Sequence, residues 1–253
     1  MSLPIGLQLY TVRTKLAEDF EGTLQTVADI GYRNVEFAGL YDRSPAEVKS
    51  ICDKLGLTAV SSHTPIDALK ADLQSQIDAA KTLGYKYIVV PFLPDALRNK
   101  AGYEQVAADM NAAGAKLAEQ GLYLCYHNHS FEFLPNEDRS RGMDILFDTT
   151  DAKHVGSELD VYWVQHGRDN PLDWMDKLKG RVPLLHIKDM ADTPDRGFAE
   201  VGTGTVDIEG VVAKGPGVGA EYLLVEQDAG WINDDPIASV RLSFENLTRI
   251  TGG

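Results

Sequence analysis

The chain alternates short apolar runs with segments of helical period, and this alternation limits its fold more than any other feature. Eight runs have strand length and are rich in β-branched or aromatic residues. Most lack in–out alternation, which is typical of strands buried on both faces. They cover residues 5–10, 34–39, 57–63, 87–92, 122–129, 155–163, 182–189 and 220–228. Eight strand-then-helix units predict an α/β chain with one (β/α)8 barrel domain over residues 1–253; a doubly wound open sheet is the alternative.

The segments between the runs carry apolar residues at helical spacing, as Phe20, Leu24 and Val27 do. A glycine stands before several of the strand-like runs, where a left-handed helix cap favours that residue. These glycines are Gly31, Gly56, Gly84 and Gly121. We therefore expect regular helix-to-strand connections within a single domain.

Composition restricts the function classes. There are 24 basic and 38 acidic residues, so the formal net charge is −14. Such an acidic chain repels phosphate backbones, which argues against a nucleic-acid partner and makes a neutral sugar the easier substrate. Cys52 and Cys125 are the two cysteines, the start "MSLPIGLQLYTVR" lacks a basic leader, and no apolar run is long enough for a bilayer. These features favour a cytoplasmic protein without a membrane partner.

The motif "GPGVGA" at residues 215–220 is the nearest approach to a dinucleotide-binding sequence. Its glycine spacing differs from G-x-G-x-x-G, and it precedes a strand-like run instead of following one. It does not indicate a nucleotide cofactor.

Polar residues gather at the ends of the predicted strands. In a barrel of parallel strands the active site lies at this carboxyl-terminal face. Four of the six histidines are among these residues, and only His154 and His166 lie elsewhere. The set is Gln8, Tyr10, Glu36, His63, His127, His129, Glu132, Asp160, Trp163, His186, Lys188, Asp189, Glu226 and Asp228.

Three of these residues suggest a metal site. Asp160, His186 and Glu226, with one carboxylate from residues 122–133, would offer three oxygens and one nitrogen to a divalent ion. Singly, each has another explanation, since Asp160 or Glu226 can cap a loop or pair with a cation and His186 can be a hydrogen-bonded core residue. Together they favour Mn²⁺, Mg²⁺, Co²⁺ or Zn²⁺, because neighbouring buried carboxylates repel unless a cation bridges them.

Four more residues are expected to bind substrate: Gln8, Glu36, His63 and Trp163. Glu36 faces the barrel interior if its two apolar neighbours face the helices. His63 can equally be a turn residue, and Trp163 can be either a wall for a sugar ring or part of the core. We also expect Lys188 to take part in catalysis, with a surface lysine as the alternative.

Five motifs resemble those of the sugar phosphate isomerase/epimerase family, and the resemblance covers essentially the whole chain. They are "GLQLYTVR" (6–13), "YHNHSFEF" (126–133), "ELDVYWV" (158–164), "HIKD" (186–189) and "VEQD" (225–228). The resemblance implies the xylose isomerase-like TIM barrel, shared with the tagatose and psicose 3-epimerases and with metal-dependent apurinic endonucleases. The loop "VGTGTVD" (201–207) resembles the glycine-containing loop that follows the seventh strand in that family.

The resemblance also implies one divalent metal ion, held by Glu, Asp, His and Glu from strands five to eight. Asp160, His186 and Glu226 match the last three ligands by position. Tyr126 or His127 stands where the first glutamate is expected, so we predict Glu132 as the fourth ligand. An imidazole in place of that carboxylate is the alternative.

In the related epimerases the two glutamate ligands take and return a proton while the metal stabilises an enediolate. This implies acid–base roles for Glu132 and Glu226, with His127 or His129 as the substitute for one of them. Alternation along a strand predicts that the two histidines lie on the same side and Asn128 on the other.

The leading hypothesis is therefore a metal-dependent isomerase or epimerase that acts on a sugar or keto-sugar through an enediolate. One alternative is a lyase or dehydratase on a keto-glycoside or keto-inositol, and another is a non-catalytic sugar-binding barrel. An apurinic endonuclease is disfavoured by the acidic charge. The oligomeric state, including a homo-oligomer, stays open.

Overall fold

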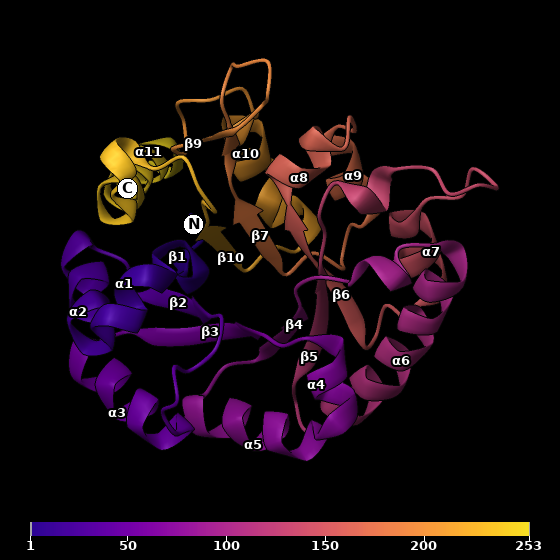
Figure 1. Cartoon of the computed structure of the whole chain (residues 1–253), viewed down its shortest axis with the longest axis horizontal. Coiled ribbons are helices and arrows are strands. Elements are labelled where there is room, and N and C mark those ends of the chain that lie inside the picture. Colours follow the sequence, from indigo (N-terminus) through magenta and orange to yellow (C-terminus); the bar gives the residue numbers. More distant parts are fainter. Residues whose placement is uncertain (1, 253) are drawn as a thin grey trace.

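The computed structural model describes residues 2–252, and eight of its strands close into a barrel (Figure 1). The barrel order is β1-β10-β7-β6-β5-β4-β3-β2, and every neighbouring pair is parallel. The strands are β1 Ile5–Gln8, β2 Asn34–Phe37, β3 Thr58–His63, β4 Tyr87–Val90, β5 Tyr123–His127, β6 Val155–Asp160, β7 Leu184–Ile187 and β10 Tyr222–Val225. Each lies within a predicted run, so the barrel prediction is confirmed. Closure rules out the open sheet.

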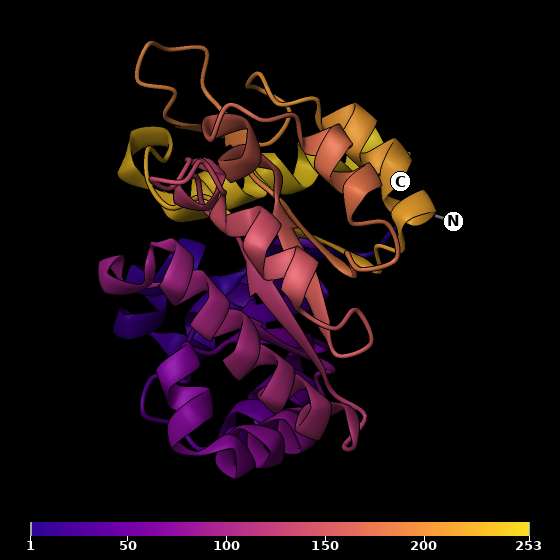
Figure 2. The ribbon, with the colours of Figure 1, turned by 90° about the vertical axis from the view of Figure 1, so that its right-hand side faces the viewer.

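Helices pack around the outside of the strands (Figure 1, Figure 2). They are α1 Arg13–Glu18, α2 Phe20–Ile30, α3 Pro45–Leu55, α4 Ile66–Ala71, α5 Leu73–Leu83, α6 Lys100–Ala118, α7 Gly142–Thr149, α8 Val161–His166, α9 Pro171–Lys177, α10 Ile208–Val218 and α11 Pro236–Thr251. Short 3₁₀ turns lie at η1 Leu9–Val12, η2 Asp95–Leu97, η3 Phe131–Phe133 and η4 Ile232–Asp234. A small antiparallel hairpin, β8 Asp189–Met190 with β9 Phe198–Ala199, follows β7. Among the described residues, no helix is both long and apolar enough to cross a membrane.

Two predicted strands end earlier than expected. The sixth run was predicted to residue 163, but β6 stops at Asp160, whose Oδ1 accepts a hydrogen bond from the Trp163 backbone at 2.8 Å and so caps α8. The fifth run was predicted to residue 129, and β5 stops at His127. Beyond these two ends the chain forms the turn η3 and the helix α8.

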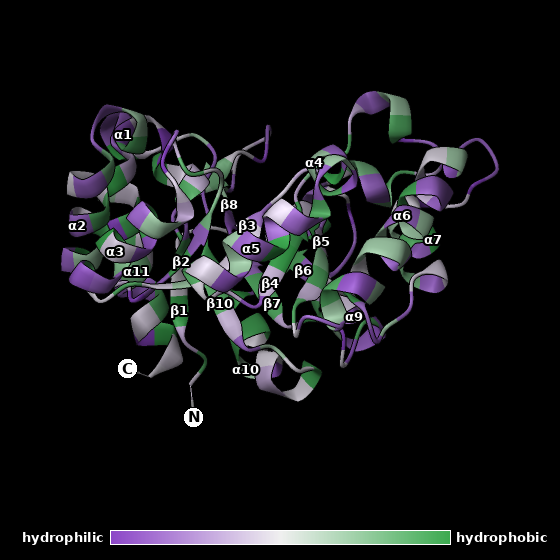
Figure 3. Ribbon diagram, turned by 90° about the horizontal axis from the view of Figure 1, so that it is seen from below, coloured by the Kyte–Doolittle hydropathy of each residue, from purple (hydrophilic) through white to green (hydrophobic). Residues whose placement is uncertain are grey.

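Apolar residues fill two compartments. The larger lies between the barrel and the helices, and Figure 3 shows hydrophobic residues along the strands with mixed colours on the surrounding helices. A smaller cluster, which we call the apolar layer, is a separate group of strand residues whose positions alternate with those facing the helices. It consists of Val60, Tyr87, Val89, Cys125, Leu184 and Leu224.

An irregularity in β3 helps to position the site. The register between β2 and β3 shifts just before Glu36, which pairs with Ser61 and leaves Val60 as an extra residue. A bulge of this kind re-aims the side chains that follow it. His63, two residues beyond Ser61, consequently faces the same side as Glu36.

Candidate active site

A cavity of about 650 Å³ lies at the carboxyl-terminal ends of the barrel strands. Its lining includes His63, His129, Lys188, Glu226 and Asp228. The aromatic side chains of Tyr10 and Phe92, 42% and 47% exposed, also line it. The mouth therefore combines titratable groups with apolar walls.

Four side chains at the base of this cavity form what we call the ligand group: His127, Asp160, His186 and Glu226. Each offers one donor atom, and these atoms lie within 4.8 Å of one another. His186 Nδ1 is 3.1 Å from Glu226 Oε2, and Asp160 Oδ2 is 3.9 Å from His127 Nε2. Asp160 Oδ2 is buried and accepts no hydrogen bond of good geometry within the described chain, but it lies 3.2 Å from the Lys188 ammonium. Two imidazole nitrogens and two carboxylate oxygens match the ligands of a divalent transition metal.

A second set of side chains, which we call the inner network, includes Gln8, Glu36, His63 and Glu158. Glu158 Oε2 lies 2.7 Å from His63 Nε2 and 3.1 Å from His186 Nε2. Gln8 Nε2 donates to Glu36 Oε1 at 2.6 Å. A metal about 2.1 Å from each ligand keeps neighbouring donors roughly 3 Å or more apart. The 2.7 Å contact instead indicates a network closed by hydrogen bonds.

Two imidazoles connect the ligand group with the inner network. His186 directs Nδ1 towards Glu226, and its Nε2 lies 2.7 Å from Glu36 Oε1. His127 directs Nε2 towards Asp160, and its Nδ1 lies 3.1 Å from Glu158 Oε2. A carboxylate behind each ring fixes its orientation, an arrangement often found behind metal-binding histidines.

The inner network is electrostatically paired. Burial alone would raise the pKa of Glu36, but the charges of His63 and His186 lower it well below its usual range. Burial alone would lower the pKa of His63, but Glu36 and Glu158 raise it to about 10. Burial and positive neighbours hold the pKa of His127 well below its usual range, so this ring stays neutral. Burial would lower the pKa of His186, but Glu158, Glu36 and Glu226 raise it well above its usual range, so His186 would have to release a proton on binding an ion.

Lys188 is buried at the mouth, so the alternative of a surface lysine is wrong. Its Nζ lies 2.7 Å from Glu226, 3.0 Å from Asp228 and 3.2 Å from Asp160. Burial would lower the lysine pKa, but the three carboxylates raise it well above its usual range. Lys188 is therefore a fixed positive charge that cannot act as a base.

His129 lies beside His127, with ring centroids 5.0 Å apart, so the two histidines share one side as predicted. Its ring stacks on Phe131 and lies 5.1 Å from Trp163. Burial, with the charge of Lys188, lowers the pKa of His129 to about 3. Within the described chain its Nδ1 has no hydrogen-bond partner. His129 is thus a neutral imidazole with a free polar atom.

Asn128 lies between the two histidines and serves a different purpose. Its side-chain oxygen accepts from the Asp160 backbone N–H at 3.0 Å, and its side-chain amide donates to the Asp160 carbonyl at 3.2 Å. These bonds extend the β5–β6 pairing beyond the end of β5. Asp160 is held in place as a result.

The prediction that Glu132 joins the metal ligands is not met. Glu132 is fully buried, and its carboxylate accepts from the Tyr126 hydroxyl at 2.7 Å and the His129 backbone at 2.8 Å. Tyr126 faces the helices, because it alternates with His127 along β5. The turn η3 therefore folds Glu132 away from the interior, and His127 stands among the potential ligands instead.

The other residues predicted to bind substrate lie either in the inner network or at the cavity. Gln8 and Glu36 are 0% exposed and belong to the inner network, so they do not line the cavity as expected of substrate-binding groups. His63 reaches both the network and the cavity. Glu158 was missed, although it precedes Asp160 by two residues and alternation places both on one face.

Two relatives of known activity are similar to the chain. It is 26% identical to the 2-oxo-tetronate isomerase of Haemophilus influenzae over 198 residues, which cover 70% of this chain and 76% of the relative. It is 20% identical to an inosose dehydratase of Clostridium botulinum over 192 residues, which cover 68% of this chain and 63% of the relative.

Solved structures share the whole barrel. A sugar phosphate isomerase/epimerase from Parabacteroides distasonis superposes with a TM-score of 0.84 and 26% identity, covering 99% of this chain and 94% of the other. The IOLI protein, solved with a bound zinc atom, superposes with a TM-score of 0.75 and 14% identity, covering 100% and 98% of the two chains. At this identity the second likeness concerns the fold alone.

The chain also matches a family model across most of its length, from residue 24 to residue 214. The barrel and the motifs that resemble an isomerase/epimerase family agree with this match. The chain belongs to the xylose isomerase-like TIM barrel family.

Proposed function

We propose that the chain is a divalent-metal-dependent isomerase or epimerase that acts on a sugar or keto-sugar through an enediolate. The observation that carries the proposal is the ligand group, in which four buried donor atoms from His127, Asp160, His186 and Glu226 lie within 4.8 Å of one another. The Lys188 ammonium lies 3.2 Å from Asp160 and 2.7 Å from Glu226, so positive charge already compensates these two carboxylates without an ion. Similarity to a 2-oxo-tetronate isomerase supports the reaction class.

The ligand group would hold the ion through His127, Asp160, His186 and Glu226. Imidazole and carboxylate donors suit Zn²⁺, Mn²⁺ or Co²⁺, and Mg²⁺ less well because it prefers oxygen. When bound, a divalent ion would polarise the substrate carbonyl and stabilise negative charge on its oxygen. The zinc of the similarly folded IOLI protein is consistent with such a site.

Glu226 is the proposed base for the proton on the carbon next to the carbonyl. Of the two carboxylates in the ligand group, Glu226 lines the cavity and Asp160 does not. Burial would raise the pKa of Glu226, but Lys188 and His186 lower it well below the usual range, so Glu226 stays ionised, and the same two charges weaken it as a base.

His129 and Lys188 would act on the substrate oxygens. His129 is neutral and lines the cavity, so its ring can exchange a hydrogen bond with a hydroxyl group. Lys188 is charged and can donate to an oxygen that becomes negative. His127 is a poorer candidate for acid–base work, because one nitrogen faces Glu158 and the other faces Asp160.

Solvent deuterium exchange tests the proposal. The protein is prepared with Mn²⁺ or Zn²⁺ and incubated in D₂O with free ketoses, a 2-oxo-aldonate and a keto-inositol. We expect deuterium at the carbon next to the carbonyl of at least one compound, with otherwise unchanged product mass. Glu226→Gln should abolish exchange, while Glu221→Gln, on an exposed residue at the other end of β10, should not.

A protein that binds no ion and promotes no exchange with any of these compounds would contradict the proposal and favour the non-catalytic sugar-binding barrel. Ion binding without exchange would remove the catalytic part of the proposal.

Similarity to an inosose dehydratase favours a second candidate, a dehydratase on a keto-sugar or keto-inositol. The first step is the same proton removal, after which the enediolate expels hydroxide, and proton transfer releases it as water. A product lighter by one water molecule would establish this candidate over the isomerase.

A further inference from the structure

The mouth cavity has two sides of different chemistry. The residues that line it at the ends of β5, β7 and β10 are titratable, and we call them the polar side: His127, His129, Lys188, Glu226 and Asp228. The residues that line it at the ends of β1 to β4 are mainly apolar, and we call these six the apolar wall: Tyr10, Ala38, Gly39, Pro65, Pro91 and Phe92. His63 also lines the cavity here, but its ring belongs to the inner network. Because β1 to β4 are consecutive around the barrel, the apolar wall occupies one side of the mouth.

Two side chains of the apolar wall are unusually exposed for their type. Tyr10 is 42% exposed and Phe92 is 47% exposed. Leu134 is the third large apolar side chain that is exposed in the described chain, and it lies outside the cavity lining. Exposed apolar groups that line a concave cavity are typical of a ligand-binding site. Two of the three thus face the space where a substrate would bind.

Both aromatic rings are held beside the polar side. The Arg13 guanidinium lies 4.1 Å from the centroid of the Tyr10 ring and donates to the Asp228 carbonyl at 3.0 Å. The Phe92 ring meets the His129 ring edge-on, with centroids 5.0 Å apart. A sugar that binds the polar side consequently has the two aromatic rings within reach of its substituents.

The cavity is larger than one ring requires. A closed cavity of about 150 Å³ is enough to bind benzene, whereas the mouth cavity measures about 650 Å³. A sugar over the ligand group therefore leaves room for a second ring against the apolar wall.

The composition of the apolar wall indicates which kind of second ring it suits. The Tyr10 hydroxyl is the one hydrogen-bonding side-chain group among its six residues. A second sugar would place several hydroxyl groups here with few side-chain partners, which is unfavourable. An apolar ring instead gains free energy when it leaves water for this surface.

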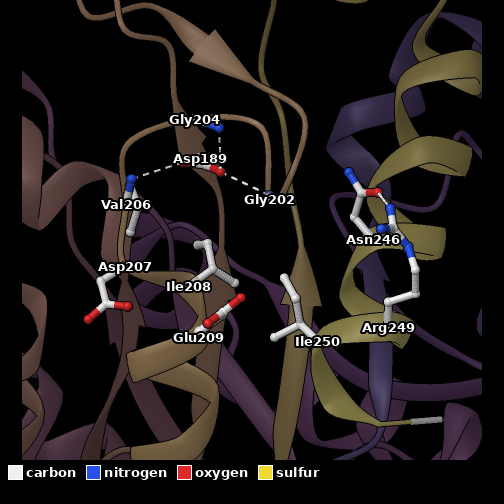
Figure 4. Close-up of a pocket in the computed structure, with 10 residues that line it drawn as sticks. All are labelled: Asp189, Gly202, Gly204, Val206, Asp207, Ile208, Glu209, Asn246, Arg249 and Ile250. Carbon is white, nitrogen blue, oxygen red and sulfur yellow. Dashed lines mark hydrogen bonds between the residues drawn. The ribbon is translucent and has the colours of Figure 1, made fainter.

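A separate pocket of about 410 Å³ lies between α10 and α11 (Figure 4). Asp189 lines it, and its Oδ2 accepts from the backbone N–H groups of Gly202 and Gly204, both at 2.9 Å. None of the described residues that line this pocket also lines the mouth cavity. A substrate at the ligand group therefore has the apolar wall beside it, and not this pocket.

We propose that the substrate is a keto-sugar whose anomeric oxygen carries an apolar ring such as phenyl, and that the apolar wall binds this ring. The keto group then lies on a ring carbon other than the anomeric carbon, because that carbon carries the substituent. Tyr10 and Phe92 determine specificity and take no part in the proton transfer. The statement about the sugar rests on the proposed function, whereas binding of the apolar ring can be tested without it.

Calorimetric titration with unreactive glycosides tests the binding of the ring. The probes are methyl and phenyl glucosides and galactosides of both anomeric configurations, which have no keto group and are not turned over. We expect the protein in Mn²⁺ to bind at least one phenyl glycoside about tenfold or more tighter than its methyl counterpart, because the phenyl ring leaves water. The disaccharide with the same glycosyl unit and configuration should not share this gain, which separates an apolar ring from a second sugar.

Variants of the apolar wall assign the gain to its residues. Phe92→Ala and Tyr10→Ala should each reduce the phenyl-to-methyl affinity ratio by about threefold to tenfold. The ratio is the readout, because a displaced His129 would weaken both glycosides alike. Phe92→Tyr keeps a ring and should keep the ratio. Leu134→Ala is the matched control, because it removes an exposed apolar side chain outside the cavity.

Four results of the titration would overturn the proposal. They are equal binding of the phenyl and methyl glycosides, saturable binding of neither, tighter binding of the disaccharide, and a ratio that both alanine variants leave unchanged.

Turnover is tested with the 3-keto derivatives of the methyl and phenyl glycosides. For deuterium exchange next to the carbonyl, kcat/KM of the phenyl compound should be about tenfold or more above that of the methyl compound. This ratio should fall in Phe92→Ala, which separates binding of the ring from its effect on reactivity. If the proposed function fails, neither ketone exchanges, but the phenyl preference in the titration persists. If the apolar wall binds no ring, both ketones exchange with similar kcat/KM, so the two failures are distinguishable.

Discussion

The ligand group and the apolar layer are two neighbouring regions built from the same strands. On β7, Leu184 belongs to the apolar layer and His186 to the ligand group; Leu224 and Glu226 repeat this step at β10. The two members of each pair are two residues apart, so alternation directs them to the same side. On each strand, a side chain that stabilises the barrel and a side chain suited to chemistry are therefore only two residues apart.

This difference teaches how a closed barrel tolerates so many buried charges. The apolar layer needs no partners, because burial itself stabilises it. The carboxylates above it would be costly without compensation, and the imidazoles and Lys188 supply it. Substitutions in the ligand group are therefore expected to impair ion binding and turnover, and substitutions in the apolar layer to impair stability.

The largest effect is expected in the ligand group. Glu226→Gln removes both the proposed base and one ligand charge, so turnover should fall by roughly a thousandfold and ion content should drop with it. The fold should persist, because the apolar layer is untouched. Kinetics and elemental analysis of purified protein check this, with Glu221→Gln as the control. Full ion content and full turnover in Glu226→Gln would break the distinction between the regions.

In the apolar layer the pattern should reverse. Leu224→Ala leaves a cavity in a fully buried cluster and should lower the free energy of unfolding by about 2–5 kcal/mol. Ion stoichiometry should stay at the wild-type value. Denaturant unfolding and metal titration measure the two quantities, and a loss of ion binding at unchanged stability would contradict the assignment.

Glu132 is a third case, because it is a carboxylate buried beside Tyr126 on the helix side of the barrel, away from the ligand group. Burial raises its pKa from 4.5 to about 7. The folded state then binds more protons than the unfolded state between these pH values, so stability falls as pH rises through this window. The full loss is about 3 kcal/mol. The free energy of unfolding is measured for wild type and Glu132→Gln at pH 5 and pH 8. We expect the additional loss of stability at pH 8 in wild type alone, and both proteins should keep the ion. Parallel pH profiles of the unfolding free energy in the two proteins would refute this role of Glu132.

The smallest effect is expected in the inner network. Glu158→Gln weakens the hold on His127 and His186 without removing a proposed ligand, so ion affinity should fall about 10- to 100-fold. Turnover at saturating ion should change far less. Competition with a coloured chelator measures the affinity. Unchanged affinity would assign the inner network to folding alone.

The barrel could be predicted because buried strands and glycine-capped helices leave regular local signals, as at Gly56 and Gly84, whose φ angles are +66° and +86°. Asp160, His186 and Glu226 could be found for the same reason, since each lies within one residue of the end of a strand. Glu132 was misassigned because the path of η3 and the bond to Tyr126 depend on tertiary structure.

The inner network and the hydrogen bonds of Asp189 leave weaker signals. A carboxylate within a buried strand is unfavourable unless distant residues compensate it, and Glu158 depends on His63, 95 positions away. Asp189 accepts hydrogen bonds from the backbone of Gly202 and Gly204, in a loop whose sequence has no regular period. Contacts of this kind become visible only when the chain is folded.

Anomalous X-ray scattering from crystals grown with Mn²⁺ tests the central claim most directly. The account predicts one strong peak per chain, bounded by His127, Asp160, His186 and Glu226, with Glu132 still bonded to Tyr126. A peak among His63, His127, Glu158 and His186, or no peak at the barrel mouth under saturating Mn²⁺, would contradict it.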